Sequence, residues 1–173
     1  MVDQSLVRRA IEGDPQSFGE LYDSLAPELY RVALYTLGNA HDAEDAVSDT
    51  FYEAYKGIKN LRDEASVKRW MLTILSARCK RRIGGYIKER KTVDIDSLIE
   101  VAEEPASDEI ISTDRLEIQQ AMQEISEEER LIINLSAMHG YTTKEISEML
   151  GMPHGTISSK LYRAYKKLRA VLT

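Results

Sequence analysis

The sequence has little of what disulfide-stabilised and metal-binding proteins need. It contains one cysteine, Cys79, in 173 residues, so no disulfide can form within the chain. This cysteine and the three histidines, at positions 41, 139 and 154, form no CxxC or HExxH pattern. We therefore expect no metal site and no other bound cofactor.

Long hydrophobic runs are also missing. No apolar run exceeds four residues, whereas a membrane-spanning helix needs about 20. The first ten residues, MVDQSLVRRA, lack the apolar centre of a signal peptide. These absences predict a cytoplasmic protein, and a hydrophobic content of 43% is enough to build a folded core.

The charged residues fall in blocks, although the net charge is only −6. Residues 61–92 carry ten Lys or Arg against three Asp or Glu, and residues 130–173 carry seven against two. Between them, residues 93–129 carry thirteen acidic side chains and one basic side chain. Two basic segments in an acidic chain indicate two surfaces that face a polyanion, although either run taken alone could be an ordinary solvated face.

Apolar residues recur at helical spacing almost throughout, and no segment shows a convincing period of two, so we predict an all-α fold. Asp3 and Asp14 stand where capping residues begin helices, and Ser66 is expected to cap a helix that carries Trp70. Ser126 and Glu129 have the spacing of a capping box. The most regular apolar stripe runs through residues 40–58.

Three features predict breaks between these helices. Pro27 is expected to break or restart its helix, and Gly84–Gly85 to loosen or end the basic helix. Residues 92–112 are acidic, contain a proline and no aromatic residue, and are typical of a linker. Fully extended, about 20 residues span roughly 65 Å, so the two flanking halves could reach separate sites on one DNA molecule. The prediction is two small helical domains, residues 1–91 and 113–173, joined by an acidic linker at 92–112.

The segment that begins at residue 142 has the pattern of a helix-turn-helix: TTKEISEML, the turn GMP, and the longer HGTISSKLYRAYKKLR. Ile146 and Leu150 would face inward from the first helix, and Gly151 permits the tight turn. The outer face of the second helix then carries hydrogen-bond donors and cations that suit a DNA major groove. An ordinary antiparallel helix pair with a basic surface is the alternative. The expected DNA-facing residues are His154, Thr156, Ser158, Ser159, Lys160 and Arg163.

The other basic segment surrounds Trp70 with cations. Cations interleaved with an aromatic side chain suit single-stranded DNA, because exposed bases stack on aromatic rings. Trp70 also lies on the apolar stripe of its helix, so a buried core tryptophan is the competing interpretation. The cations are the stronger indication of nucleic-acid binding.

Three motifs follow one another along the chain: DAEDAVSDTF at 42–51, SVKRWMLTI at 66–74 and EISEMLGMPHGTISSKLYRA at 145–164. Over nearly the whole chain they resemble the polymerase-binding, promoter-melting and upstream-recognition segments of extracytoplasmic-function sigma factors, which direct bacterial RNA polymerase to promoters. The resemblance implies a sigma factor, not an enzyme. It also implies core RNA polymerase, promoter DNA (duplex and melted strand) and an anti-sigma factor as partners.

The resemblance implies roles for individual residues as well. Those that face the polymerase would be Asp42, Glu44, Asp45, Asp49 and Tyr52. Those at the minus ten element, either in the corner at 60–66 that holds a flipped base or along the separated strand, would be Asn60, Arg62, Lys68, Arg69, Trp70, Thr73, Arg78 and Arg81. The helix-turn-helix residues named above would face the upstream minus thirty-five site. Ala77 and Arg81 stand where the family commonly has Asn and Asp, so the family's base-reading pair is not expected here.

Two other functions fit part of the sequence. One is a DNA-binding regulator that works without polymerase and uses its first 90 residues to sense or dimerise, which leaves the Trp-bearing basic helix unexplained. Another is an adaptor that keeps a sigma-like shape. An enzyme is the least expected, because the carboxylates have no convergent His or Cys partner in the pattern.

Overall fold

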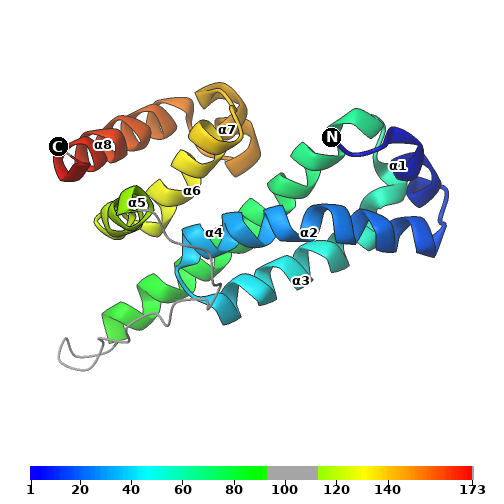
Figure 1. The fold of residues 1–173 in the computed structure, drawn as a ribbon, viewed down its shortest axis with the longest axis horizontal. Helices are drawn as coiled ribbons and strands as arrows, with labels where there is room; N and C mark the ends of the chain where they lie inside the picture. The colour runs from blue at the N-terminus through cyan, green and yellow to red at the C-terminus, as the bar shows by residue number, and fades with distance from the viewer. Residues whose placement is uncertain (93–112, 173) are drawn as a thin grey trace. The chain divides into compact units, whose positions relative to one another are not determined.

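A computed structural model describes residues 1–92 and 113–172, and within these ranges the chain is helical with no strand (Figure 1). The all-α prediction is therefore confirmed. The linker expected at 92–112 lies, apart from Thr92, outside the described residues. The helices are α1 (Gln4–Ile11), α2 (Pro15–Leu37), α3 (Ala40–Gly57), α4 (Val67–Thr92), α5 (Thr113–Gln123), α6 (Glu127–Ile133), α7 (Thr143–Leu150) and α8 (His154–Leu172), with short turns η1 (Ile58–Asn60), η2 (Glu64–Ser66) and η4 (Asn134–Met138).

The chain divides into two compact units, Met1–Arg82 (unit 1) and Ile83–Thr173 (unit 2). The division falls inside α4. The domain bounds predicted from the sequence stay a prediction, because the expected linker is not described. None of the helices formed by the described residues is long and apolar enough to cross a membrane.

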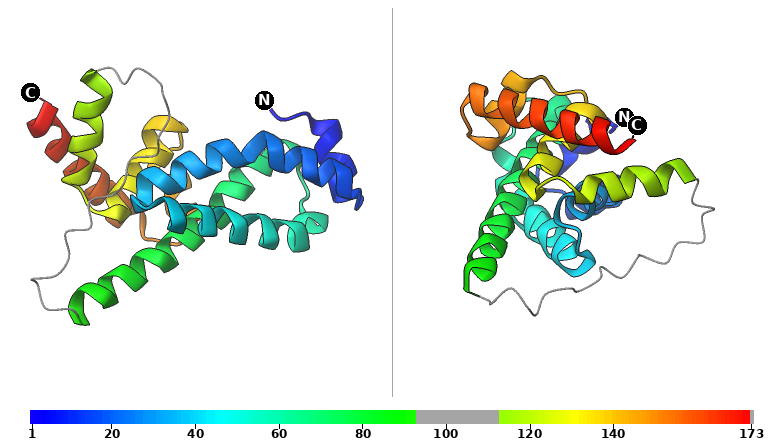
Figure 2. Two further views of the ribbon diagram at one scale, coloured as in Figure 1. Left: turned by 60° about the horizontal axis from the view of Figure 1, so that its bottom comes forward. Right: turned by 90° about the vertical axis from the view of Figure 1, so that its left-hand side faces the viewer.

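Unit 1 is built on the antiparallel pair of α2 and α3, which lie side by side in Figures 1 and 2. The predicted caps begin its first two helices: the Asp3 carboxylate accepts the N–H of Ser5, and the Asp14 carboxylate accepts the N–H groups of Gln16 and Ser17. These caps satisfy donors that the first turn of a helix leaves unpaired. The core combines residues from α1 to α4, among them Val7, Leu21, Leu29, Phe51, Met71 and Leu75.

Two predicted interruptions are wrong. Helix α2 continues through Pro27, because the residues that pack it into the core, Leu25 and Leu29, are both buried. Pro27 cannot donate to the carbonyl of Asp23, but both residues are exposed, so water can bond that carbonyl. Helix α4 likewise continues through Gly84–Gly85, which costs about 1 kcal/mol per glycine but forbids no helical dihedral.

The start of α4 also differs from the prediction. Ser66 was expected to cap α4, but it lies in the turn η2, where its hydroxyl donates to the carbonyl oxygen of Asp63 at 2.7 Å. The capping carboxylate of this turn belongs to Asp63, which accepts the N–H of Ala65. The corner at 60–66 is therefore a hydrogen-bonded turn with its own cap.

Unit 2 contains two capping boxes. Ser126 and Glu129 form the predicted one at the start of α6, and Thr142 and Glu145 form a second at the start of α7. Between α6 and α7, η4 is a π-helical turn that no sequence pattern indicated. The apolar core is formed by Leu131, Ile132, Leu135, Ile146 and Ile157, with a neighbouring cluster of Ile125, Ile133 and Ala164.

Candidate nucleic-acid interface

The helix-turn-helix of α7 and α8 is present as predicted. Gly151 ends α7 with a φ of 62°, in the left-handed region where a residue with a side chain is strained. Ile146 from α7 and Ile157 from α8 are fully buried, so the two helices pack at a fixed angle. The outer face of α8 is thereby turned to solvent.

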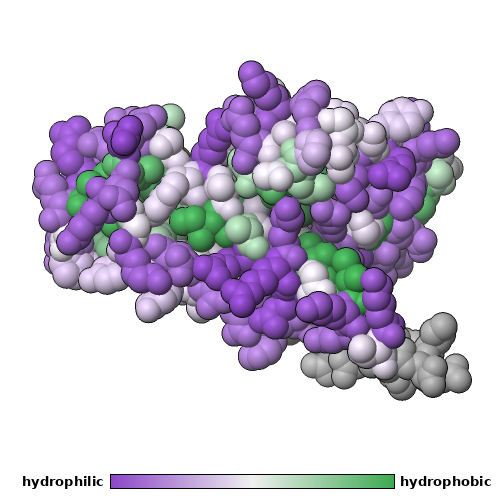
Figure 3. Space-filling view, turned by 180° about the vertical axis from the view of Figure 1, so that it is seen from behind, coloured by the Kyte–Doolittle hydropathy of each residue, from purple (hydrophilic) through white to green (hydrophobic). Residues whose placement is uncertain are grey.

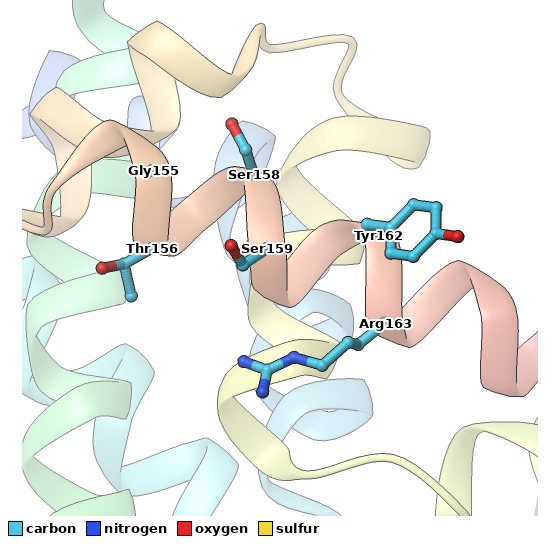
Figure 4. A pocket seen from close by; sticks show the side chains of 6 residues that line it. All are labelled: Gly155, Thr156, Ser158, Ser159, Tyr162 and Arg163. Carbon is cyan, nitrogen blue, oxygen red and sulfur yellow. The ribbon is translucent and has the colours of Figure 1, made fainter.

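The outer face of α8 gathers hydroxyl groups, one tyrosine and one arginine around a shallow hollow (Figure 4). Arg163 is exposed, and its guanidinium extends back along α8 toward Ser159 and Thr156. Tyr162 is 70% exposed. Tyr162 is not among the residues predicted from the sequence, although its spacing of four residues from Ser158 places it on the same helix face. The lining residues are Gly155, Thr156, Ser158, Ser159, Tyr162 and Arg163.

Two other predicted DNA-facing residues are engaged within unit 2. His154 is exposed, and its Nε2 lies 2.8 Å from the hydroxyl oxygen of Thr143, the first residue of α7. The Nζ of Lys160 lies 3.0 Å from a carboxylate oxygen of Glu128, and these side chains are only 23% and 28% exposed. Lys160 is therefore partly covered and already paired.

A second ion pair joins the same two helices. The Nζ of Lys167 lies 3.3 Å from the Glu129 carboxylate, which also accepts the N–H of Ser126 in the capping box. Burial raises the pKa of Glu129, but the Ser126 N–H and the Lys167 ammonium lower it more, so the pKa lies below its ordinary value. The glutamates of α6 thus neutralise two lysines of α8. Among the side chains that the structure describes, no acidic one pairs with Arg163.

The cations of α4 in unit 1 lie opposite acidic side chains of α2 and α3. The Nζ of Lys68 is 2.7 Å from the Glu28 carboxylate, and a guanidinium nitrogen of Arg78 is 3.2 Å from that of Glu53. Arg82, which sequence analysis left out of the site, pairs in the same way at 3.6 and 3.4 Å with Asp42 and Asp45. Arg81 is exposed.

Trp70 is neither a buried core residue nor a freely exposed ring. It is half-buried, and Cζ2 of its indole lies 3.4 Å from the point where a Cβ on Gly57 would stand. A methyl group at position 57 would therefore be in van der Waals contact with the ring. Near it on α4, the Thr73 hydroxyl donates to the Arg69 carbonyl at 2.8 Å, and both residues are half-buried.

The corner at 60–66 precedes α4. Asn60 and Arg62 are exposed, as a base-contacting role would need. In this corner, the carboxylate of Glu64 accepts two hydrogen bonds from Arg8, one from Nε at 2.8 Å and one from Nη2 at 3.1 Å. That partner lies in α1, far away in the sequence.

The residues predicted to face the polymerase split into two groups on α3. Asp42 and Asp45 face Arg82, as described above, whereas Glu44 and Asp49 are exposed. Tyr52 is exposed, and the Nζ of Lys56 lies 4.4 Å from its ring centre. Glu44 borders a second hollow between α2 and α3, which sequence analysis missed; its other lining residues include Tyr22, Asp23, Pro27, Tyr30 and Ser48.

Most of the surface in Figure 3 is hydrophilic, and the hydrophobic areas on it are small and separate. In the described part of the chain, no three His, Cys, Asp or Glu side chains are placed to hold a metal ion. Cys79 is buried, and burial raises the pKa of its thiol to about 12. The features that remain are the two basic helix faces, the corner at 60–66 and the acidic side of α3.

Comparisons with known proteins match both units. The family model described as Sigma-70 region 2 matches residues 21–85, and that described as Sigma-70, region 4 matches residues 115–168. The ECF RNA polymerase sigma factor SigL of Mycobacterium tuberculosis is 33% identical over 156 residues, which cover 88% of this chain and 86% of the relative. SigM, an ECF sigma factor of the same species, is 28% identical over 170 residues, which cover 98% of this chain and 84% of SigM.

A solved structure is similar over both units. It is the sigma factor RpoE in complex with the anti-sigma factor NepR from Bartonella quintana, with a TM-score of 0.68 and 26% sequence identity. The alignment covers 91% of this chain and 97% of that one. CnrH, in complex with the cytosolic domain of CnrY, has the same fold at a TM-score of 0.61.

Proposed function

The chain belongs to the ECF RNA polymerase sigma factors, and we propose that its two units divide the work of such a factor between two stretches of promoter DNA. Sigma factors are not enzymes: they bind core RNA polymerase, direct it to promoters and allow transcription to start. The observation that carries this function is the order of the two matches, region 2 on unit 1 and region 4 on unit 2. Its place of action is the cytoplasm, with the polymerase.

Unit 2 reads the upstream minus thirty-five site with the outer face of α8. The hydroxyls of Thr156, Ser158 and Ser159 can donate to or accept from base edges, and Arg163 can bind a guanine through two hydrogen bonds. The first turn of α8 offers backbone N–H groups to a phosphate. His154 and Lys160 stand at the margins of this face, where phosphates are the expected contact.

Unit 1 holds the minus ten element with α4 and the corner at 60–66. Asn60 and Arg62 lie on the exposed corner, and Trp70 and Thr73 lie on the helix that follows. When a strand binds, its phosphates replace the carboxylates that now pair with Lys68 and Arg78. Arg69 and Arg81 complete the set of minus ten residues.

The polymerase docks on the acidic side of α3. Glu44, Asp49 and Tyr52 are exposed there and are the residues best placed for a direct contact. Asp42 and Asp45 support the surface through their pairs with Arg82. An anti-sigma factor is a further proposed partner, because the similar RpoE structure is a complex with one.

The free protein should bind promoter DNA weakly. Opening about ten base pairs costs on the order of 10–15 kcal/mol at roughly 1.4 kcal/mol per step, which 173 residues of an acidic protein cannot supply alone. The deciding experiment is in vitro transcription with core RNA polymerase over a library of promoter sequences. We expect transcripts only when both proteins are present. Melting of duplex DNA by the isolated chain would contradict the proposal.

A regulator that works without polymerase is not favoured, because the region 2 match covers most of the segment that it would use for sensing. Co-purification separates the two functions. The full chain should bring down core RNA polymerase, and the triple variant Glu44→Gln, Asp49→Asn, Tyr52→Ala should bring down less. The control is the triple variant Glu12→Gln, Glu20→Gln, Glu148→Gln, which replaces three exposed acids that do not line the second hollow.

A further inference from the structure

Helix α1 has no role in any function discussed so far. Its inner face, Leu6, Val7 and Ala10, is buried in unit 1, and it contacts both η1 and η2, the turns on either side of Leu61–Asp63. Helix α1 therefore packs against the corner at 60–66. Its outer face carries Arg8, which is exposed apart from one partner in that corner.

That partner is Glu64, 56 positions away in the sequence. The Nε of Arg8 donates to Oε1 at 2.8 Å and the Nη2 to Oε2 at 3.1 Å, so the guanidinium and the carboxylate meet as two forks. A pair of this kind fixes direction as well as distance. The hydrogen bond from Arg8 lowers the pKa of Glu64 below its ordinary value.

The position of the Arg8–Glu64 pair indicates that it orients the corner at 60–66 and adds little to the stability of the fold. The Arg8 side chain is 64% exposed and that of Glu64 23% exposed, and exposed ion pairs contribute little to folding. The local hydrogen bonds of the corner, from Ala65 N–H to the Asp63 carboxylate and from the Ser66 hydroxyl to the Asp63 carbonyl, fix the shape of the turn. The fork from Arg8 ties that shaped turn to a helix anchored in the core.

We propose that Arg8 is a positioning residue for the minus ten element. Its fork with Glu64 keeps the corner at 60–66 in the position in which the corner receives the flipped base. The inference rests on the proposed function of that corner. Binding sites gain from a fixed supporting shell, because a loop that must be ordered on binding loses part of its affinity.

The test uses holoenzyme, assembled from core RNA polymerase and the full chain, with promoter DNA that carries 2-aminopurine at successive positions of the minus ten element. Fluorescence rises where a base leaves the stack. Arg8→Gln removes the fork, Arg8→Lys keeps only the charge, and Arg31→Gln is the control for loss of an exposed arginine outside the proposed sites. The exchange Arg8→Glu with Glu64→Arg restores the fork in reverse.

We expect Arg8→Gln and Arg8→Lys to lower the equilibrium constant for base capture about two- to fivefold, the scale of one exposed ion pair. The control should behave as the wild type, and the exchange variant should recover base capture relative to Arg8→Gln. Core binding, upstream-site binding and the thermal midpoint should stay unchanged in all variants. Selective loss at the flipped base, with rescue by the exchange, supports the positioning role.

Three results would overturn it. Base capture by Arg8→Gln equal to that of the wild type means that the fork does not position the corner. A lowered thermal midpoint or weakened core binding in step with the loss means that Arg8 is merely structural. If wild-type holoenzyme shows no fluorescence rise at any minus ten position while it still transcribes, the proposed function of the corner fails first and the inference fails with it.

Discussion

The two basic helices, α4 in unit 1 and α8 in unit 2, look alike in the sequence and differ in how their charges are used. On α4, Lys68, Arg78 and Arg82 each lie within 3.6 Å of a carboxylate from α2 or α3. On α8, Lys160 and Lys167 pair with α6, whereas Arg163 stands exposed beside a row of hydroxyl groups. A count of cations therefore overstates the positive surface of both helices, but α8 keeps an exposed arginine among the residues expected to contact bases.

The difference has a consequence for binding. A paired cation must give up its carboxylate before it binds a phosphate, so its net gain is smaller and fewer counterions are released from the DNA. An exposed arginine can bind a base edge at the cost of its hydration and rotamer freedom. We expect α8 to depend on one arginine, and α4 to depend on Trp70 and on the exchange of partners.

The largest expected effect comes from destabilising unit 2, which carries α8. Ile157 is fully buried between α7 and α8, so Ile157→Ala should lower the free energy of unfolding of unit 2 by about 2–5 kcal/mol. Urea unfolding followed by hydrogen exchange of each unit would measure it. Val171→Ala, an exposed change on the same helix, should stay within about 0.5 kcal/mol. Equal losses in both units would mean that the units do not unfold separately.

The next effect tests the arginine of α8. Arg163→Ala should weaken binding of holoenzyme to the upstream site by about 1–3 kcal/mol if Arg163 contacts a guanine. Lys160→Ala should cost less than Arg163→Ala, because Glu128 already pairs with Lys160. Fluorescence anisotropy with an upstream duplex would measure both, with Lys166→Ala as an exposed control on α8. An unchanged affinity in Arg163→Ala would remove its recognition role.

A third change frees one arginine of α4 from its carboxylate partner, so that it resembles the exposed Arg163 of α8. Glu53→Gln removes the carboxylate beside Arg78, so holoenzyme should bind the separated minus ten strand up to about 1 kcal/mol more tightly. The salt dependence should also steepen by about one unit of slope, since one more cation meets a phosphate without losing a partner. Glu20→Gln, an exposed acid on α2, is the control. Weaker binding in Glu53→Gln would show that the pair orients Arg78 for the strand.

The smallest effect concerns pH. The pKa of Glu129 in the folded chain lies below the ordinary value of 4.5, so its contribution to stability is present above about pH 4.5 and is lost as the pH falls through the folded pKa. Glu129→Gln should reduce this acid-dependent loss in unit 2, by less than about 1 kcal/mol. Urea unfolding across the acid range would measure it. Glu124→Gln, exposed and nearby, should keep the wild-type pH dependence; the same flattening in both variants would contradict the assignment.

Local patterns were sufficient where the cause of a structure is local. The Asp3 and Asp14 caps, the Ser126 capping box and the turn at Gly151 each depend on neighbouring residues, and all of them were predicted. Pro27 was misjudged because its local penalty is outweighed by packing of residues on either side of it. The fork between Arg8 and Glu64 joins positions that no periodicity relates. Tyr162 lies on the predicted face of α8, but that prediction was limited to cations, histidine, serine and threonine.

The amino-acid sequence by itself determined the helical fold, the helix-turn-helix and the membership of the ECF sigma factors, because periodicity, capping and motif order are properties of the chain. The tertiary structure alone decided which carboxylate neutralises which cation, that the Trp70 ring lies beside Gly57, and that α1 packs against the corner at 60–66. The reason is physical: the effect of a charge depends on what lies within a few ångströms of it, and only folding brings distant residues to that distance.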